Sequence, residues 1–381
     1  MQKTIAEINH YTSFTVNPLS LPEQTYELYS VPSYDSGLPE IIQGKEIGST
    51  KVAVRENDVL VCKINPRINR VWVVKHHTQH PLIASSEWIV IRSPENDCEY
   101  LKWYFMSPKF HRMMVSQVTG IGGSLTRAQP KQVATYPVPI PDLPTQRRIA
   151  ATLDKVSEGI ALCKQMLADL DELVKSQFVE MFGDLETNPK GYEQRKLRSL
   201  ANKISDGVHA KPEYTETGRP FISVVNINKG VIDFEECKFV SEDAYQKMIK
   251  STHPERGDIL YTKVGATYGI PAYVDTDTEF CLYVSVCLIK PKHDEIDARF
   301  LALSMSMPYI KRQADSRIKG IGVPDLHLNQ IREFDVICPP RHEQEAFVTF
   351  IEQIDKSKFA VQQQLVELET LKESLMQEYF G

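Results

Sequence analysis

The chain has 381 residues, of which 42% are hydrophobic and 25% are charged, and its formal net charge is −6. This length predicts two or three domains, each able to bury its own core. The sequence contains no apolar run of about 18 residues, which is the length that would predict a membrane span. Residues 1–7 contain no hydrophobic segment of a secretory signal, and the seven cysteines form no Cys-x-x-Cys pair, so we expect a cytoplasmic protein with reduced thiols.

Residues 1–145 are predicted to form a domain of mixed helices and strands. Residues 58–63 and 87–92 are rich in β-branched and aromatic side chains and predict strands. Residues 99–106 predict a helix. The domain therefore belongs to the α/β (α+β) class.

Residues 146–184 are predicted to form one long helix that begins at Thr145 as N-cap and ends at Gly183. Their apolar residues recur at alternating steps of four and three, the heptad pattern of a helix that packs along its length against a partner helix. The seam residues are Ile149, Leu153, Val156, Ile160, Cys163, Leu167, Leu170 and Val174.

Residues 185–342 predict a second domain of the same class. Residues 220–225 and 258–262 are short β-rich runs bounded by glycines, and residues 280–289 predict one long buried strand. Residues 297–307 predict a helix, in the same place as in the first domain.

Residues 343–381 predict a second long helix, in which Lys358 and Lys372 occupy the places of apolar residues of the first helix. The seam residues are Phe347, Ile351, Ile354, Val361, Leu365 and Leu368, after which the pattern shifts to Leu371 and Leu375. A helical stretch of about 33 residues in each segment spans about 50 Å at 1.5 Å per residue, and we expect the two to form an antiparallel coiled coil within the chain. The alternatives are that each helix packs only on its own domain, or that the helices drive dimerisation.

The chain contains an internal repeat. A shift of 198 residues aligns the helical segments without a gap, and a shift of 200 aligns parts of the domains, such as Asp58-Val59-Leu60 with Asp258-Ile259-Leu260. The chain is therefore a tandem duplication. Most of its acidic excess lies in the two helices, so the overall charge neither supports nor excludes binding to DNA.

Several segments match one protein family. They are Gly191-Tyr192-Glu193 with Lys196-Leu197, the run from Gly218 to Ile222, the run from Arg256 to Leu260, and Pro339-Pro340-x-x-Glu343-Gln344 with its counterpart Pro141-x-x-Pro144-Thr145-Gln146. With the order domain, helix, domain, helix, they make the whole chain resemble the specificity subunits of type I restriction-modification enzymes. The first domain departs from the second, because Asn65-Pro66-Arg67 replaces Val264-Gly265-Ala266.

The resemblance implies that residues 1–145 and 185–342 are target-recognition domains and that residues 146–184 and 343–381 are spacer helices. It implies a non-catalytic chain that binds double-stranded DNA, two methyltransferase subunits and restriction subunits, and reads a two-part target. No Asn-Pro-Pro-aromatic element and no nucleotide-binding Gly-x-x-x-x-Gly-Lys-Ser/Thr motif occurs in the sequence. S-adenosylmethionine, ATP and Mg²⁺ are therefore expected in the partner subunits, and no cofactor in this chain.

Base edges are read by side chains that form paired hydrogen bonds, and phosphates are held by basic side chains, in both cases most often from loops. The candidates in the first domain are Lys63, Asn65, Arg67, Asn69, Arg70, Thr119, Ser124, Arg127 and Gln129. The candidates in the second domain are His209, Lys211, Lys263, Thr267, Tyr268, Arg317 and Lys319.

Two motifs have competing interpretations. The cluster His76-His77-x-x-His80 would need further ligands to hold a metal, so we favour a polar turn between two strands. Gly120-Ile121-Gly122 lacks the context of a nucleotide loop and is repeated near Gly320, so we favour a shared structural turn.

Lys63 and Lys263 are matched by the repeat, as are Ser85 and Ser285, so a Lys–Ser catalytic dyad is a conceivable rival. Asp58 and Asp258 are interpreted as turn residues before strands. A coiled-coil scaffold or adaptor without DNA contact is the other alternative.

Overall fold

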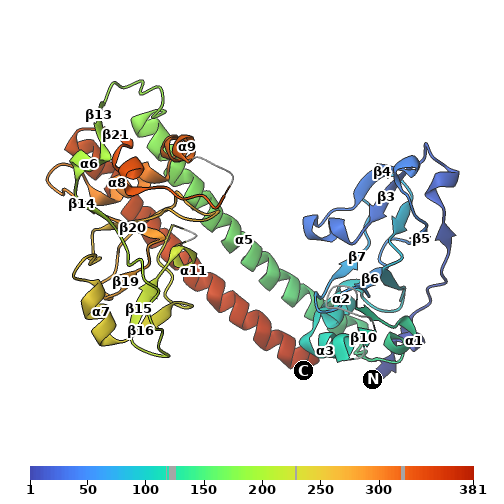
Figure 1. Cartoon of the computed structure of the whole chain (residues 1–381). Coiled ribbons are helices and arrows are strands. Elements are labelled where there is room, and N and C mark those ends of the chain that lie inside the picture. Colours follow the sequence, from blue (N-terminus) through green and yellow to red (C-terminus); the bar gives the residue numbers. More distant parts are fainter. Residues whose placement is uncertain (117, 120–125, 228–229, 319–321) are drawn as a thin grey trace. The chain divides into compact units, whose positions relative to one another are not determined.

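The computed structural model describes residues 1–116, 118–119, 126–227, 230–318 and 322–381. The chain divides into two compact units, unit 1 (Met1–Gln165 with Val361–Gly381) and unit 2 (Met166–Ala360). Each unit contains one globular domain and a segment of both long helices, α5 (Leu143–Phe182) and α11 (Arg341–Phe380) (Figure 1).

The domain of unit 1 is built on a five-stranded sheet of order β2-β5-β8-β3-β4 and a three-stranded sheet of order β7-β6-β9. Strands β1 and β12 pair and so join the two ends of the domain. The elements are β1 (Gln2–Thr4), α1 (Ile5–Ile8), β2 (Thr15–Val16), β3 (Thr25–Tyr29), β4 (Glu40–Gln43), β5 (Lys51–Ala53), β6 (Val59–Cys62), β7 (Val71–Val73), β8 (Leu82–Ala84), β9 (Trp88–Ile91), α2 (Cys98–Met106), α3 (Pro108–Ser116), β10 (Val118–Thr119), β11 (Arg127–Ala128), α4 (Pro130–Val133) and β12 (Pro137–Pro139).

The domain of unit 2 is built on a four-stranded sheet of order β14-β20-β17-β18 and a three-stranded sheet of order β16-β15-β19, and β13 pairs with β21. The elements are β13 (Glu193–Lys196), α6 (Leu197–Leu200), β14 (Ala201–Asp206), β15 (Arg219–Ile222), β16 (Lys238–Val240), α7 (Glu242–Met248), β17 (Ile259–Thr262), β18 (Pro271–Tyr273), β19 (Cys281–Leu282), β20 (Val286–Pro291), α8 (Ala298–Ser306), α9 (Pro308–Arg317), α10 (Leu328–Arg332) and β21 (Asp335–Cys338).

The two domains share a topology. Strand β6 pairs antiparallel with β7 and β9, and β17 pairs antiparallel with β18 and β20. Each domain also has one parallel pair, β3 with β8 and β15 with β19. Helix α2 begins after the N-cap Asp97, and α8 begins after Asp297, 200 residues later. The structure thus confirms the prediction of two similar domains of mixed helices and strands.

Two strand predictions in the second domain were wrong. Residues 280–289 do not form one strand, because the chain turns at residues 283–285 between β19 and β20, which belong to different sheets. The turn is closed by Val286 N–H donating to Tyr283 O at 3.0 Å. Residues 220–225 form β15 only as far as Ile222 and then a 3₁₀ turn. Because the strands on both sides of such a turn are buried, the apolar run continues across the turn in the sequence and does not reveal it.

The prediction for the start of the first long helix was also wrong, by three residues, because the cap is Asp142 and not Thr145. Helix α5 begins at Leu143, so Thr145 lies inside the first turn. The Asp142 carboxylate accepts a hydrogen bond from Thr145 N–H at 3.1 Å and thereby caps the helix. Hydrogen bonds from Thr145 lower the pKa of Asp142. The helix ends as predicted before Gly183, whose φ of 78° is left-handed.

The long helices pack against each other in both units, as predicted. In unit 1, a Cβ added at Gly159 of α5 would lie 3.1 Å from Leu368 Cδ1 of α11, and Lys164 pairs with Glu369 at 3.0 Å. In unit 2, Lys358 of α11 pairs with Asp171 of α5. The start of each helix contacts the end of the other, so the pair is antiparallel.

The seam of α11 does not shift to Leu371 as predicted, because Leu371 is 45% exposed. Lys372 faces inward instead, with its Nζ 5.0 Å from the centre of the Trp103 ring. Burial lowers the pKa of Lys372, and the nearby Lys164 lowers it further. The regular heptad phase therefore continues through a lysine whose ammonium group lies over an aromatic ring.

Equivalent phenylalanines at the helix ends complete the cores of both domains. Phe182 of α5 lies 5.0 Å from Phe300 and 5.4 Å from Phe347, between ring centres, in unit 2. Phe380 of α11 lies 5.7 Å from Tyr100 in unit 1. Both phenylalanines are nearly inaccessible to solvent, so each domain core depends on both helices.

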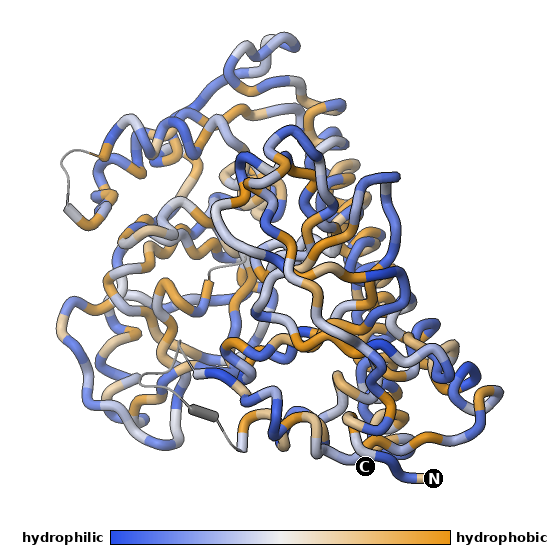
Figure 2. Tube along the Cα trace, turned by 90° about the vertical axis from the view of Figure 1, so that its right-hand side faces the viewer, coloured by the Kyte–Doolittle hydropathy of each residue, from blue (hydrophilic) through white to orange (hydrophobic). Residues whose placement is uncertain are grey.

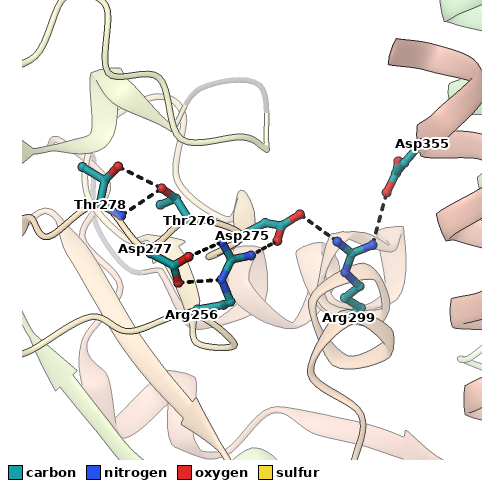
Figure 3. A network of polar contacts seen from close by, with 7 residues as sticks. All are labelled: Arg256, Asp275, Thr276, Asp277, Thr278, Arg299 and Asp355. Carbon is teal, nitrogen blue, oxygen red and sulfur yellow. Dashed lines mark hydrogen bonds and ion pairs between the residues drawn. The ribbon is translucent and has the colours of Figure 1, made fainter. Parts of the chain in front are cut away.

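Each domain is tied to a long helix by ion pairs, and the charges of two positions are reversed between the domains. In unit 2, Arg299 of α8 bridges Asp275 at 2.8 Å and Asp355 of α11 at 3.3 Å (Figure 3). In unit 1, the equivalent of Arg299 is Glu99, which pairs at 2.9 Å with Lys75, the equivalent of Asp275. Both domains therefore form an ion pair between these two positions, but the positive and negative residues are exchanged.

Hydrophobic and hydrophilic residues are interleaved along the chain (Figure 2). Among the helices of the described residues, none is both long and apolar enough to cross a membrane.

All seven cysteines are free thiols, and burial raises the pKa of several, including Cys62 and Cys98.

Candidate nucleic-acid interface

The two candidate clusters of the first domain lie together. The loop between β6 and β7, residues 63–70 (loop L1), forms a β-bridge through Ile64 with Arg127. Asn65 N–H donates to Thr126 O at 2.8 Å, and Ala128 N–H donates to Lys63 O at 2.9 Å. The structure therefore places two segments that are some 60 residues apart in one hydrogen-bonded surface.

Two basic side chains of loop L1 are unengaged. Lys63 is half-buried and Arg67 is exposed, and neither makes a hydrogen bond or ion pair with the part of the chain that the structure describes. Arg70 is half-buried, and its Nε has no hydrogen-bond partner among the described residues. None of these three cations forms an ion pair with a described carboxylate, so each adds a positive charge that is not neutralised locally to the region of loop L1.

Other candidates of the first domain have structural partners. Asn69 Nδ2 donates to Phe105 O at 3.2 Å, and Asn65 has a left-handed φ of 46°. The Arg127 guanidinium donates two hydrogen bonds to Glu87, at 3.2 and 3.1 Å. These residues shape the loop and the segment beside it.

The remaining candidates of the first domain flank α4 and the short β10–β11 pair. The backbone of Thr119 pairs with Arg127, and Gln129 is exposed in front of α4. Ser124 lies outside the described residues, as does the Gly120-Ile121-Gly122 motif.

The second domain repeats the loop arrangement with different charges. In the loop between β17 and β18, residues 263–270 (loop L2), Val264 forms a β-bridge with Asp325, which occupies the place of Arg127. Gly265 N–H donates to Pro324 O, and Leu326 N–H donates to Lys263 O, both at 2.9 Å. The frame that joins the two segments is thus common to both domains.

Lys263 is neutralised inside this frame. It is 5% exposed, and its Nζ lies 3.5 Å from Asp206 Oδ1 and 3.6 Å from Asp325 Oδ1. Burial raises the pKa of Asp206, although Lys263 opposes the rise. Lys63 has no such carboxylate partners among the described residues, so the two matched lysines are in opposite electrostatic settings.

The tip of loop L2 is held by helix α9. The Tyr268 hydroxyl donates to Asp315, and Lys311 Nζ lies 3.7 Å from the centre of the Tyr268 ring. Thr267 is exposed beside it. The tip therefore offers a hydroxyl and an aromatic edge rather than a free cation.

Three further candidates lie away from loop L2 or inside the domain. His209 is exposed, with Nε2 3.8 Å from Asp206 Oδ2, and Lys211 lines an open groove with Lys247 of α7. Arg317 is engaged within the domain, because it donates to Gln313 O and Glu333 O and its guanidinium carbon lies 5.2 Å from the centre of the Phe334 ring. Lys319 lies outside the described residues.

The structure gives no support to a Lys–Ser dyad. The Ser285 hydroxyl oxygen accepts a hydrogen bond from Val224 N–H at 3.2 Å, and Lys263 Nζ is paired with the two aspartates. The matched aspartates are turn residues, as predicted. Asp58 accepts hydrogen bonds from Arg55 N–H and Arg92, and Asp258 accepts them from Glu255 N–H and Lys290.

The histidine cluster forms the predicted turn, between β7 and β8. The buried Glu27 carboxylate accepts hydrogen bonds from the backbone of His77 and Thr78 and fixes the turn. Within the described ranges, no group of three residues is placed to hold a metal ion.

The sequence-based candidates omit two residues on equivalent helices. His111 of α3 has its Nε2 3.0 Å from Pro66 O in loop L1, and Lys311 of α9 contacts loop L2. A shift of 200 residues aligns the two positions. The signal was therefore present in the repeat, but only the structure shows that both helices face the loops.

Comparisons with known proteins agree on one family. The family model described as "Type I restriction modification DNA specificity domain" matches residues 4–172 and again residues 189–370. The MjaVIII specificity subunit of Methanocaldococcus jannaschii is 21% identical over 351 residues, which cover 87% of this chain and 80% of that protein. The EcoKI specificity subunit of Escherichia coli K12 is 19% identical over 73% of this chain and 64% of that protein.

Solved structures show the same fold. A chain from a structure titled for complex assembly and conformational transition of the type I restriction-modification system has a TM-score of 0.62, with 18% identity over 100% of this chain and 97% of that one. The type I specificity subunit of M. genitalium has a TM-score of 0.60, with 14% identity over 100% and 96%. Because the family model matches two consecutive stretches that together cover most of the chain, this chain belongs to the specificity subunits of type I restriction-modification systems.

Proposed function

We propose that the chain is a non-catalytic subunit that reads a two-part target in double-stranded DNA. One observation carries the proposal. Loops L1 and L2 follow equivalent strands, and each is bound to a second segment of its domain by the same backbone hydrogen bonds, but the side chains of the two loops differ. A shared frame with different side chains suits the reading of two different half-sites. The unengaged cations of loop L1 supply donors for bases or phosphates.

The paired helices support a target with a fixed gap. Helices α5 and α11 have 40 residues each, which corresponds to about 60 Å of continuous helix, and each contributes to both units. We propose that they set the length of the unread spacer. Insertion of four residues beside Cys163 should change the spacer or abolish activity, and an unchanged spacer in an active complex would contradict this role.

The reactions themselves are assigned to partners. We propose that the chain recruits two methyltransferase subunits and the restriction subunits, in which S-adenosylmethionine, ATP and Mg²⁺ would act. The family membership supports this assignment, and the setting would be the cytoplasm, where such a complex meets cellular DNA.

The test is methylome sequencing of the native host with and without this gene. We expect a methylated motif of two short sequences with a constant gap, present only when the gene is intact. A methylome that does not change would refute the proposal, and a contiguous motif would refute its two-part form.

A further inference from the structure

We propose that Arg67 reads a guanine in the half-site of the first domain, and that His111 is the residue that positions it. Lys311 has the same positioning role for loop L2 in the second domain. This inference rests on the proposed function and names the residue and base that the first domain uses.

Arg67 lies at the tip of a tight turn. Ile68 N–H donates to Asn65 O at 3.0 Å, which closes a turn with Pro66 and Arg67 as its central residues. Proline presets the backbone at the first central position, and Asn65 adopts the left-handed φ that leads into the turn. The local sequence Asn-Pro-Arg thus builds a stiff turn that presents one arginine.

The turn is anchored on both sides. On one side it is bound to residues 126–128 by the backbone hydrogen bonds already described. On the other side, Asn69 is held by Phe105 O and Pro66 O by His111 Nε2. Because a carbonyl oxygen only accepts, His111 Nε2 is the donor. The Pro66 carbonyl belongs to the peptide bond that precedes Arg67, so this hydrogen bond fixes the plane from which the arginine projects.

The neighbouring residue Ile68 favours a base, rather than a phosphate, as the group that Arg67 contacts. Ile68 is 47% exposed at the same tip, and an apolar side chain suits the base edges and thymine methyl groups of the major groove better than the charged backbone. Arg67 itself has no partner in the described part of the chain, so its paired donors are free to meet guanine O6 and N7. A rigid turn lowers the entropy lost when these hydrogen bonds form.

In the second domain, the residue equivalent to His111 also contacts its loop, but through an aromatic ring and not through a backbone carbonyl. Lys311 of α9 covers the Tyr268 ring, and a Cβ added at Gly269, whose φ is 91°, would lie 2.9 Å from Lys311 Cδ. Loops L1 and L2 share few residues, but both are contacted from position 111 or its equivalent. The position therefore supports the loop, and the loop sequence determines what is read.

The experiment uses the full chain, purified with its co-expressed methyltransferase subunits, to select from a random double-stranded DNA library. The variants are Arg67→Ala, His111→Ala, His111→Gln, Lys311→Ala and, as control, His342→Ala, which removes an exposed histidine in unit 2. We expect Arg67→Ala to reduce the preference for one guanine roughly tenfold or more, with the other half-site unchanged. His111→Ala should relax the same half-site, and His111→Gln, which keeps a donor, should restore part of the preference.

Lys311→Ala should relax only the other half-site, and His342→Ala should change neither. The inference is overturned if Arg67→Ala weakens all sequences equally, which would make Arg67 a phosphate contact, or if His111→Ala leaves the first half-site intact. Thermal unfolding of each variant separates loop positioning from loss of fold, and the exposed Arg67 remains testable if His111→Ala does not fold. A wild-type complex with no sequence preference would instead refute the proposed function.

Discussion

Gln146 and Gln344 make the same buried hydrogen bond in the two halves of the chain. Each Oε1 accepts from the backbone N–H of an N-capping aspartate, Asp97 at 2.9 Å and Asp297 at 2.8 Å. Both glutamines are 1% exposed, and each also donates to a proline carbonyl at the start of its long helix. The pair thus ties α5 to α2 and α11 to α8.

Removal of this amide should destabilise the protein. Gln344→Ala leaves the backbone N–H of Asp297 and the carbonyl of Pro339 buried without partners, which should lower the free energy of unfolding by about 2 kcal/mol. Chemical denaturation measures the change. Gln353→Ala, at an exposed position of α11, is the matched control and should cost under about 0.5 kcal/mol. Equal losses for the two variants would show that the buried amide has no special role.

The reversed ion pairs allow a charge-exchange test. Arg299→Glu places a carboxylate beside Asp275 and Asp355, and should destabilise the protein by about 2 kcal/mol. Addition of Asp275→Lys copies the Lys75–Glu99 pair of the first domain and should recover up to about 1 kcal/mol. Recovery stays partial because Asp355 still faces Glu at position 299, and because the new lysine replaces the aspartate that pairs with Arg256. A double-mutant cycle of unfolding free energies gives the coupling, and a coupling of zero would mean that the pairs are incidental.

The opposite settings of Lys63 and Lys263 predict different effects on the salt dependence of DNA binding. Lys63 has no ion-pair partner among the described residues, so Lys63→Ala should make the plot of log affinity against log salt less steep by about 0.9. Lys263 is already neutralised by Asp206 and Asp325, so Lys263→Ala should leave the slope unchanged. Titrations of a fixed duplex between low and moderate salt measure both slopes, and equal slopes for the two variants would contradict the assignment.

Lys372 predicts a stability that depends on pH in the alkaline range. Its pKa is lowered in the folded state, so the unfolded chain binds the proton more tightly, and the charged lysine weakens the fold below its folded pKa. Lys372→Met should therefore stabilise the protein by about 1 kcal/mol at pH 7. This gain should shrink as pH rises toward 10.5, where the wild-type lysine becomes neutral.

Thermal unfolding at pH 7 and at pH 10 measures the gain, with Lys356→Met as control because Lys356 is exposed on the same helix. A gain that is independent of pH would indicate packing on Trp103 alone as its cause.

Much of the architecture was predictable because it depends on short-range patterns. Heptad spacing identified both long helices, and the repeat identified two domains of one topology. The left-handed glycine at position 183 ends α5 as expected. The break at residues 283–285 was not predictable, because both flanking strands are buried and their apolar runs join in the sequence.

By itself, the sequence determined the duplication and the helix pair, and it predicted the loops that would read DNA. Only the tertiary structure decided which loop cations are available: Lys263 meets carboxylates from β14 and from residue 325, while Arg317 is held by Gln313 and the carbonyl of Glu333. The reason is that helix periodicity reports the burial of near neighbours, whereas the charge and freedom of a side chain depend on groups that folding brings from distant parts of the chain.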